Sequence, residues 1–551
     1  MKKTILALLL AASLLLAGCG APDLGSAVSE PLSEAARQES GSESAEEQAA
    51  DSDMAQTGAK RAPKIVIDAV YDSRYDYDLG FSFGNGLASL LYCGDKLETE
   101  DYESVRDDGN YPALSAALRA YNDEARRSLR SDLDEIENMA RMDYASGNYP
   151  GADDYGMVYC REELSWLQRA DSRLVSFMKE SYWSAGGAHP YTGYQGLNFD
   201  SETGERLTIN AVLSESGRAD FPAVFETELF AQYPDFREGL LVDSVAGTIR
   251  QEMAEGRVEF TLDAWGMTVL ISPYELASYA NGPAFVRLSF ADYPALFEPD
   301  YARTDENAII EMRPQRDSGW YSPLNTVKLY TPTGERSLNV QYIPDNYELG
   351  RMCSLTVTLD GASWQADDFY GFSVSPYLFQ VEGKNYLYLA YQMPNDWDAL
   401  YVLDLSGSEP ILLGSMSEAF GAQIPTDPDD FLLCTRSYCM STYGIARSYR
   451  IAPDGRPVSM EELYTVTHGP TLTLRQPLGV TELTAEGGER QTTLAAGTEL
   501  SFYRTNNSDL VELRDTEGKV YRVSYDRGED YIGKVNGIPL TEAFDGVMFA
   551  G

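Results

Sequence analysis

Histidine is almost missing from this sequence of 551 residues, which contains only His189 and His468. Most protein metal centres and many acid–base catalytic sites use histidine, so the composition argues against such sites from the start. Basic residues are also scarce, because 43 Lys and Arg stand against 86 Asp and Glu, a formal net charge of −43. A surface this acidic repels phosphate backbones, so we expect no nucleic-acid partner and instead an attraction for cationic proteins.

Long apolar runs are missing after the N-terminus. Residues 5–16 form an apolar stretch behind two lysines, and this stretch is shorter than the ~18 residues that a membrane-spanning helix needs. Its length and flanks are typical of a secretion signal. The stretch ends in a Leu-Ala-Gly-Cys motif that resembles the lipobox of bacterial lipoproteins, with Cys19 as the cysteine. The resemblance implies cleavage before Cys19 and attachment of diacylglycerol to its thiol.

The mature chain should therefore be anchored by lipid on the extracytoplasmic face of the cell membrane, with residues 1–19 as the signal peptide with its lipobox and Cys19 as the new N-terminus. Two acyl chains hold a protein stably on a bilayer. An ordinary secretion signal with a chance cysteine is the alternative. Residues 20–62 are rich in Ser, Glu, Ala and Gln, a composition that cannot bury a core, and we predict a disordered tether.

Residues 63–300 have the pattern of an α+β domain with helices on a mainly antiparallel sheet. Apolar residues recur at steps of three and four from Leu114 to Met139, which predicts a long amphipathic helix with Pro112 in its first turn. Alternating apolar residues at 258–262 and 267–271, with Gly266 between them, predict a hairpin.

The helical pattern is lost after residue 300. Residues 301–468 contain short aromatic strands separated by tight turns, which predicts a β-rich domain of propeller-like or sandwich type. About 165 residues would make only four blades at the usual ~40 residues per blade, so closure of a propeller is left open. The apolar runs in residues 469–551 resemble the small SH3-like β-barrel of bacterial envelope proteins.

Two segments of the first domain resemble a known extracytoplasmic domain. They are the Tyr-Trp-Ser-Ala-Gly-Gly-Ala-His-Pro run that ends at Pro190 and the Pro-Tyr-Glu-Leu-Ala-Ser-Tyr-Ala-Asn-Gly-Pro run at residues 273–283. The pair is similar to the domain shared by the lysozyme-sensing anti-sigma factor RsiV and the N-terminal part of the peptidoglycan deacetylase PdaC. The chain lacks the sigma-binding segment of the former and the metal-dependent domain of the latter. The resemblance therefore implies an envelope domain and transfers neither activity.

Aromatic side chains in these two segments are the candidate ligand-binding residues. Tyrosine is abundant, with 37 in the chain, and exposed rings can form a platform for a carbohydrate or a peptide. Packing within strands is the alternative role for such residues. The candidates are Trp183, His189, Tyr191, Tyr194, Tyr274 and Tyr279.

Motifs for catalysis and metal binding are weak. Gly80 to Gly84 match the G-x-S-x-G pattern around Ser82, but a polar segment precedes them and a turn signal follows, where a nucleophile elbow needs a strand and a helix. Acidic clusters such as Asp427, Asp429 and Asp430 lack the spacing of a calcium loop. We predict no metal site, no cofactor and no catalytic residues.

Cysteines outside the signal peptide number five: Cys93, Cys160, Cys353, Cys434 and Cys439. Their spacing matches no zinc or redox motif. Cys434 and Cys439 are close enough in sequence to pair across a turn, and Cys93 with Cys160 would link two parts of the first domain. One thiol is left over in a monomer, and some of the five can simply be small buried residues.

Together these features predict a membrane-anchored lipoprotein that binds or senses an envelope or extracellular ligand without catalysis. A cationic protein such as lysozyme, or a cell-wall component, is the expected partner, because the acidic chain speeds encounters with cations. The alternative is a cell-wall glycan hydrolase or deacetylase that works through carboxylates.

Overall fold

The computed structural model describes most of the chain beyond the predicted tether. The described residues are 61–78, 80–94, 109–149, 159–186, 189–302, 307–312, 315–316, 323–331, 334–343, 354–366, 373–393, 397–484, 487–528 and 532–549. The signal peptide, Cys19, the tether and Cys353 lie outside them. In this part of the chain, no helix is long and apolar enough to span a bilayer.

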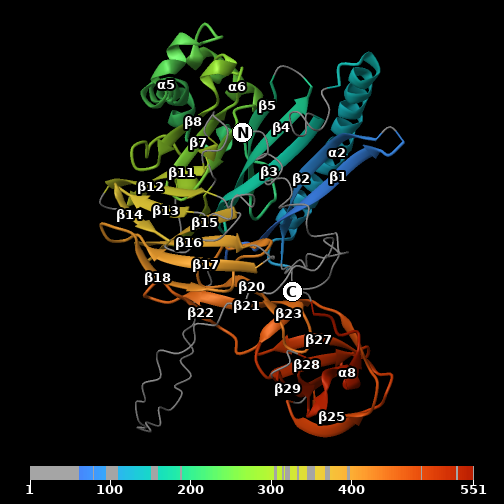
Figure 1. The fold of residues 1–551 in the computed structure, drawn as a ribbon. Coiled ribbons are helices and arrows are strands. Elements are labelled where there is room, and N and C mark those ends of the chain that lie inside the picture. The colour runs from blue at the N-terminus through green and yellow to red at the C-terminus, as the bar shows by residue number, and fades with distance from the viewer. Residues whose placement is uncertain are drawn as a thin grey trace. The chain divides into compact units, whose positions relative to one another are not determined.

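The first region is built on a six-stranded sheet with the order β19-β1-β2-β3-β4-β5 (Figure 1). All neighbours are antiparallel except β2 and β3, which run parallel and are connected through the long helix α2. This arrangement agrees with the expected mainly antiparallel sheet. The elements are β1 (Ile65–Asp76), β2 (Phe81–Cys93), α2 (Pro112–Ser146), β3 (Tyr159–Ala170), β4 (Leu174–Ala185), β5 (Tyr191–Asp200) and β19 (Gln423–Ile424).

Helix α2 confirms the predicted amphipathic helix. Pro112 occupies its first turn, and Gly147 ends it in a left-handed conformation with φ 75°. Its buried stripe lies against β2, where Gly84 and Gly86 let the helix approach closely. A Cβ at Gly86 would lie 2.6 Å from the side chain of Leu133. Side chains larger than glycine at these positions would therefore push the helix off the sheet.

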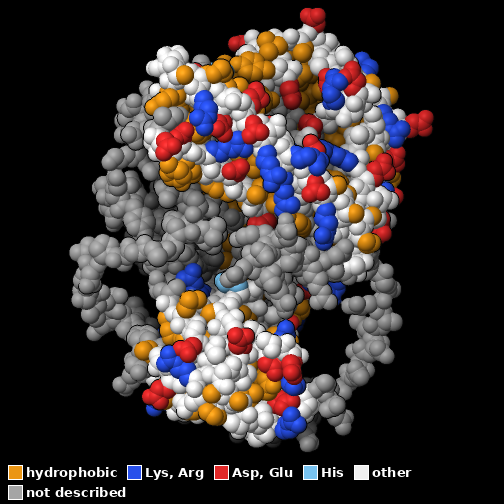
Figure 2. Space-filling view, turned by 90° about the vertical axis from the view of Figure 1, so that its right-hand side faces the viewer, with side chains coloured by type: hydrophobic (Ala, Val, Ile, Leu, Met, Phe, Trp, Pro, Cys, Tyr) orange, Lys and Arg blue, Asp and Glu red, His pale blue; other side chains and the backbone are white. Residues whose placement is uncertain are grey.

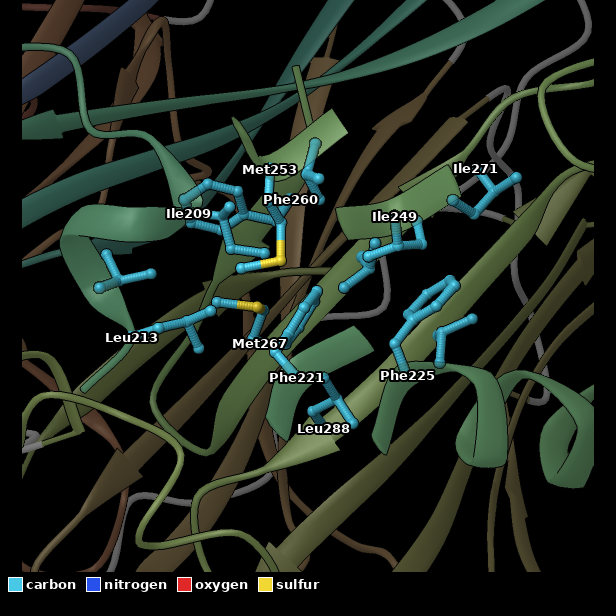
Figure 3. Packing of buried hydrophobic residues seen from close by; sticks show 14 of the residues in the cluster. Ile209, Leu213, Phe221, Phe225, Ile249, Met253, Phe260, Met267, Ile271 and Leu288 are labelled. Atoms are coloured by element: carbon cyan, nitrogen blue, oxygen red, sulfur yellow. The ribbon is translucent and has the colours of Figure 1, made fainter. Parts of the chain in front are cut away.

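A second layer packs on β4 and β5. It consists of α4 (Ile209–Val212), α5 (Glu215–Gln232), η2 (Pro234–Glu238), α6 (Val245–Glu255) and the three-stranded sheet β6 (Phe260–Leu262), β7 (Gly266–Ile271) and β8 (Ala284–Ser289). Ser214 and Ser244 cap α5 and α6 by accepting hydrogen bonds from Gly217 N and Gly247 N. Figure 3 shows how Phe221 and Phe225 of α5 point toward the apolar side chains of α6 and of the sheet.

The middle region contains two five-stranded antiparallel sheets, β10-β11-β12-β13-β14 and β18-β17-β16-β15-β9. Leu338 and Val357 of the first sheet share a core with Leu378 and Leu387 of the second, so the two sheets pack against each other as in a sandwich. Their strands are β9 (Ala308–Glu311), β10 (Gln315–Arg316), β11 (Pro323–Thr331), β12 (Gly334–Ile343), β13 (Ser354–Leu359), β14 (Ala362–Gln365), β15 (Ser373–Val381), β16 (Lys384–Met393), β17 (Trp397–Asp404) and β18 (Ile411–Met416).

The C-terminal region is a sheet of 13 strands whose main path is β20-β21-β23-β27-β28-β29-β25-β26. Its strands are β20 (Phe431–Ser437), β21 (Tyr443–Ile451), β22 (Pro457–Ser459), β23 (Tyr464–His468), β24 (Thr471–Leu474), β25 (Leu478–Leu483), β26 (Glu489–Leu494), β27 (Glu499–Thr505), β28 (Leu510–Asp515), β29 (Val520–Asp526), β30 (Lys534–Val535), β31 (Ile538–Pro539) and β32 (Phe544–Asp545). The described residues thus form a β-rich, multidomain protein whose sheets are open; within them neither a closed propeller nor a closed barrel forms.

Sheets and cores cross both predicted domain boundaries. Across residue 300, Ile65 of β1 pairs with Ile424 of β19, and one apolar cluster joins Phe177 of the first region to Phe379 of the middle region. Across residue 468, β23 pairs with β27, where Tyr464 lies opposite Thr505. Residues 61–551 accordingly group as one compact unit.

Candidate functional site: an exposed aromatic platform

The structure brings three of the predicted ligand-binding residues together at the surface. The imidazole of His189 stacks on the ring of Tyr279, with 4.2 Å between centroids and 17° between planes. The ring of Tyr274 lies 5.6 Å from Tyr279 on the same cluster. Tyr274 is 51% and Tyr279 37% exposed, and His189 is also exposed. We call these three residues the aromatic platform.

Tyr274 has a backbone conformation that non-glycine residues rarely adopt. Its φ is 72°, in the left-handed region, and its N–H donates to the carbonyl of Ala277 at 3.1 Å. This conformation costs about 1–2 kcal/mol for a residue with a Cβ. A side chain held in this way, with half of its surface exposed, contributes little to the core and points to a surface role.

The loop that carries Tyr274 and Tyr279 is fixed from two sides. Leu241 N donates to Leu276 O at 2.9 Å, and Ser278 N donates to Gly239 O at 2.9 Å. On the other side, Tyr194 N of β5 donates to the buried hydroxyl of Ser272 at 3.0 Å. The platform therefore stands on a preorganised support, which lowers the entropy lost on binding.

A hydrogen bond also links the loop to the residue that follows His189. The hydroxyl of Tyr279 donates to Pro190 O at 3.3 Å, beside His189. Gly186, at the end of β4, has φ 78°, which permits the bend before His189.

Glu259 lies beneath the loop and acts as a structural acceptor. Its carboxylate accepts from Gly196 N at 2.9 Å and from Gln195 Nε2 at 3.4 Å, at the outer edge of β5. Burial raises the pKa of Glu259, while the bond from Gly196 and the charge of Arg206 lower it. Both carboxylate oxygens of Glu259 therefore accept hydrogen bonds from residues of β5, so this side chain links the second layer to the six-stranded sheet.

The other three predicted residues are not part of this ring stack. Trp183 packs against the α2 cluster that contains Ile136 and Ala140, and Tyr191 is its exposed partner across β4 and β5. The ring of Tyr194 packs edge-on against Phe285 at 4.9 Å. The sequence could not show which of these aromatic residues bind a ligand and which pack in the fold, because both roles use the same residue types.

The nucleophile-elbow match at Ser82 lies at the start of β2, directly after the turn from β1, and the turn expected after the motif does not form, because Asn85 and Gly86 continue the strand. Ser82 lies on β2, opposite Tyr75 of β1, in an antiparallel pair. Among the described residues, no three His, Cys, Asp or Glu side chains lie together as metal ligands would. Asp430 of the acidic cluster instead pairs with Arg61 at 3.3 Å and Lys64 at 3.6 Å.

Strand register separates Cys93 from Cys160. Cys160 of β3 lies opposite Asn85 of β2, and Cys93 is eight residues farther along β2, about 26 Å at ~3.3 Å per residue. A disulfide needs Cα atoms within about 7 Å, so the structure does not bring this pair together. Cys439 is a free thiol that donates to Ser508 O at 3.4 Å, so it is not joined to Cys434 in this structure.

Two buried glutamates escaped sequence analysis. Glu163 of β3 is 5% exposed at its side chain and contacts Arg161 at 3.2 Å and Lys179 at 3.3 Å. Glu311 of β9 accepts a hydrogen bond from Leu167 N at 3.0 Å. Nothing in the sequence distinguished them among 86 acidic residues, because their environments come from distant strands.

No protein-family model matches the sequence. No curated protein matches it either. Two of the solved structures with a distant likeness are DUF3298 proteins. One is a DUF3298 family member from Bacteroides fragilis, with 15% identity, a TM-score of 0.29, and coverage of 44% of this chain and 96% of that chain. The other is a DUF3298 family protein from Pseudomonas aeruginosa, with 14% identity, a TM-score of 0.29, and coverage of 45% and 100%. Because the TM-scores are low, this likeness does not identify the fold or the function.

Proposed function

We propose that the chain is a lipid-anchored, extracytoplasmic binding protein that recognises an envelope or extracellular ligand through the aromatic platform. The observation that carries the proposal is the exposed stack of His189, Tyr279 and Tyr274 on a strained but well-supported loop. Energetically important binding residues are often tyrosines on rigid supports. The resemblance to the extracytoplasmic domain of RsiV and PdaC is compatible with this role.

A cationic ligand suits the surroundings of the platform. The segment beside the loop carries exposed Asp235, Glu238 and Asp243 against one exposed cation, Arg237. Tyrosine faces also attract Arg and Lys side chains through cation–π contacts. The net charge does not make the whole surface acidic, because Figure 2 shows a face where Lys and Arg side chains lie among Asp and Glu. We therefore expect recognition to depend on the local acids near the platform.

The first test measures binding of lysozyme and of soluble peptidoglycan fragments to the full-length protein in detergent. Replacing both Tyr274 and Tyr279 with Ala should weaken binding of the true ligand by at least about tenfold, because truncating central aromatic contacts typically costs 2 kcal/mol or more. Tyr77→Ala is the matched control, since Tyr77 is 89% exposed on the turn between β1 and β2.

Salt separates the two ligand types. Binding of lysozyme should weaken between low and high salt, whereas stacking of an uncharged glycan should change little. Equal affinity of the double variant and the wild type for both probes would remove the platform as the binding site. Turnover of the peptidoglycan fragments would instead support the alternative of a carboxylate-dependent hydrolase or deacetylase.

The second test concerns the anchor. Cys19→Ala should release the protein from the membrane fraction and abolish incorporation of radiolabelled fatty acid, because the thiol is the lipid attachment point in a lipobox. Cys439→Ala is the control, since Cys439 lies in the folded region. Unchanged membrane partitioning of the Cys19 variant would contradict the proposed localisation.

Two architectural details also remain our proposals. The middle region would be of the sandwich type, the second of the two types that the sequence predicts, with its two antiparallel sheets packed through a shared apolar core. The C-terminal region would be related to SH3-like barrels, with β27, β28 and β29 as its meander.

A further inference from the structure

One acidic side chain joins the first region to the middle region through hydrogen bonds. The parallel pairing of β2 with β3 ends at Ala88 and Glu163. Farther along β3, the N–H of Leu167 donates to the carboxylate of Glu311 on β9 at 3.0 Å, and Figure 1 shows this end of β3 reaching the strands of the middle region. Glu311 thus supplies the acceptor for an N–H group that lies beyond the paired part of β2 and β3.

Within the described residues, the partners of Glu311 carry no positive charge. Glu311 lies opposite Tyr377 of β15 and accepts a hydrogen bond from its hydroxyl. On β3, the guanidinium of Arg169 pairs instead with Asp171 at 2.5 Å. In the part of the chain that the structure describes, the groups that act on the Glu311 carboxyl group are the N–H of Leu167 and the hydroxyl of Tyr377, both of them neutral.

The second layer reaches the same strands through Trp265. This residue lies in the turn between β6 and β7, and its Nε1 donates to Gln380 Oε1 of β15 at 3.0 Å. β15 in turn pairs with β9. The acid of the turn, Asp263, is balanced by Arg287 at 2.5 Å, whereas Glu311 has neutral partners.

A small cleft brings solvent close to this contact. It lies where the β3–β4 turn, the β6–β7 turn and β9 meet, and it is lined by residues 168–171, Ala264 and residues 307–309. Ile309 is two residues before Glu311 on the same strand. A small displacement of β9 would therefore bring water to the carboxylate.

The closed contact favours the protonated form of Glu311. Burial raises the pKa of Glu311 to about 7, whereas the hydrogen bonds from Leu167 and Tyr377 lower it. A glutamate in water has a pKa near 4.3. The closed contact therefore binds its proton more tightly than an opened, hydrated one. Its stability is greatest below about pH 4 and falls as the pH rises towards 7.

We propose that the contact of β3 with β9 and β15 is a pH-sensitive joint, which is closed while the Glu311 carboxyl group is protonated and loosens when that group ionises. The two regions stay connected when the joint loosens, because β1 also pairs with β19 through Ile65 and Ile424. The proposal concerns the conformation of the chain and does not depend on the function proposed for the aromatic platform.

Hydrogen–deuterium exchange of the full-length protein in detergent tests the joint. Exchange is measured from pH 5 to pH 8 and expressed as protection factors, which remove the effect of pH on the intrinsic exchange rate. Protection of residues 164–170 of β3 and of β9 should fall at least about tenfold across this range, because ionisation favours the opened joint. Protection of β28 in the C-terminal region should fall less, because its local opening does not expose Glu311.

Three variants separate the carboxyl group from its surroundings. Glu311→Gln removes the titrating group and should keep the protection of residues 164–170 constant from pH 5 to pH 8. Glu409→Gln, at an exposed position of the middle region, should lose protection as the wild type does. Tyr377→Phe removes a donor that lowers the pKa of Glu311, so the loss of protection should begin at a higher pH. A purely structural contact would lower protection at every pH without moving that point.

Three outcomes would overturn the proposal. The first is constant protection of residues 164–170 in the wild type from pH 5 to pH 8. The second is an equal loss at β3, β9 and β28, which would mean that pH acts on global unfolding alone. The third is a loss in Tyr377→Phe that begins at the same pH as in the wild type, and this variant decides the question even if Glu311→Gln fails to fold.

Discussion

Two buried glutamates in different regions of the molecule are stabilised in opposite ways. Glu163, between α2 and the first sheet, meets Arg161 and Lys179 and accepts a hydrogen bond from the hydroxyl of Tyr121 at 2.8 Å. Glu311, between β3 and the middle region, receives the N–H of Leu167 and the hydroxyl of Tyr377, which lies opposite it on β15. The first carboxylate is balanced by cations, whereas the second is held by neutral donors.

The difference shows how a buried acid depends on its partners. Burial penalises the charged form of a carboxyl group, and nearby cations or hydrogen-bond donors offset that penalty. At Glu311, burial outweighs the two donors and raises the pKa to about 7. Two opposing effects act on Lys179, the partner of Glu163. Burial lowers the pKa of Lys179, whereas the negative charge of Glu163 raises it. The contact at Glu163 therefore depends on paired charges, whereas the contact at Glu311 is most stable when the Glu311 carboxyl group is protonated.

The largest expected effect breaks the paired contact. Glu163→Gln leaves Arg161 and Lys179 mostly buried, at 11% and 14% side-chain exposure, without their shared carboxylate. Removing one partner of a buried ion pair typically costs 3–5 kcal/mol, so we expect urea denaturation at pH 7 to show a loss of about 3 kcal/mol. Glu124→Gln is the control, because the pair of Glu124 with Arg127 is exposed and screened by solvent, so its loss should change the stability little.

The comparison of these two variants also shows which result would contradict the prediction. A Glu163→Gln variant as stable as the Glu124→Gln variant would show that the buried charges around β3 find other partners or water. The expected ranking depends only on burial, since both substitutions remove one negative charge and keep nearly the same volume.

A smaller effect, which depends on pH, sharpens the comparison. In the unfolded chain Glu311 would have a pKa near 4.3, below its folded value of about 7. The folded state therefore binds more protons between these values, and this residue's contribution to stability falls as pH rises from about 4 to 7 and is constant above that. This difference between the unfolded and folded pKa corresponds to roughly 4 kcal/mol across that window.

Glu311→Gln tests this sign directly. The variant lacks the titrating group, so its free energy of unfolding relative to wild type should rise by about 2–3 kcal/mol between pH 5 and pH 7.5 in urea titrations. Glu409→Gln, at an exposed position before β18, should show no such change. A pH-independent difference between wild type and Glu311→Gln would mean that Glu311 is ionised in both states.

Local features of the fold were accessible from the sequence. The helix around Leu118 and Leu133 and the hairpin across Gly266 follow from residue spacing, because helices and strands bury side chains at periods of 3.6 and 2. The tertiary arrangement was less accessible. Pairing of Ile65 with Ile424 and of Tyr464 with Thr505 joins regions that were predicted as separate domains, and local periodicity carries no information on such long-range contacts.

In the candidate site, too, some features could be predicted from the sequence and others could not. The two resembling segments pointed to His189, Tyr274 and Tyr279, which the structure places in one cluster. The same reasoning selected Trp183, which lies against α2. The left-handed backbone at Tyr274 and its support through Ser272 left no mark in the sequence, because both arise from the closing of a loop between β7 and β8.

The sequence by itself determined the charge of the chain, the scarcity of histidine, the periodicities of its main elements and the motif at Cys19. Each of these is a property of residue type or of neighbours along the chain. The tertiary structure decided which aromatic rings are exposed and which glutamates have cationic partners. Those properties depend on burial and on contacts between residues far apart in sequence, and such contacts exist only once the chain has folded.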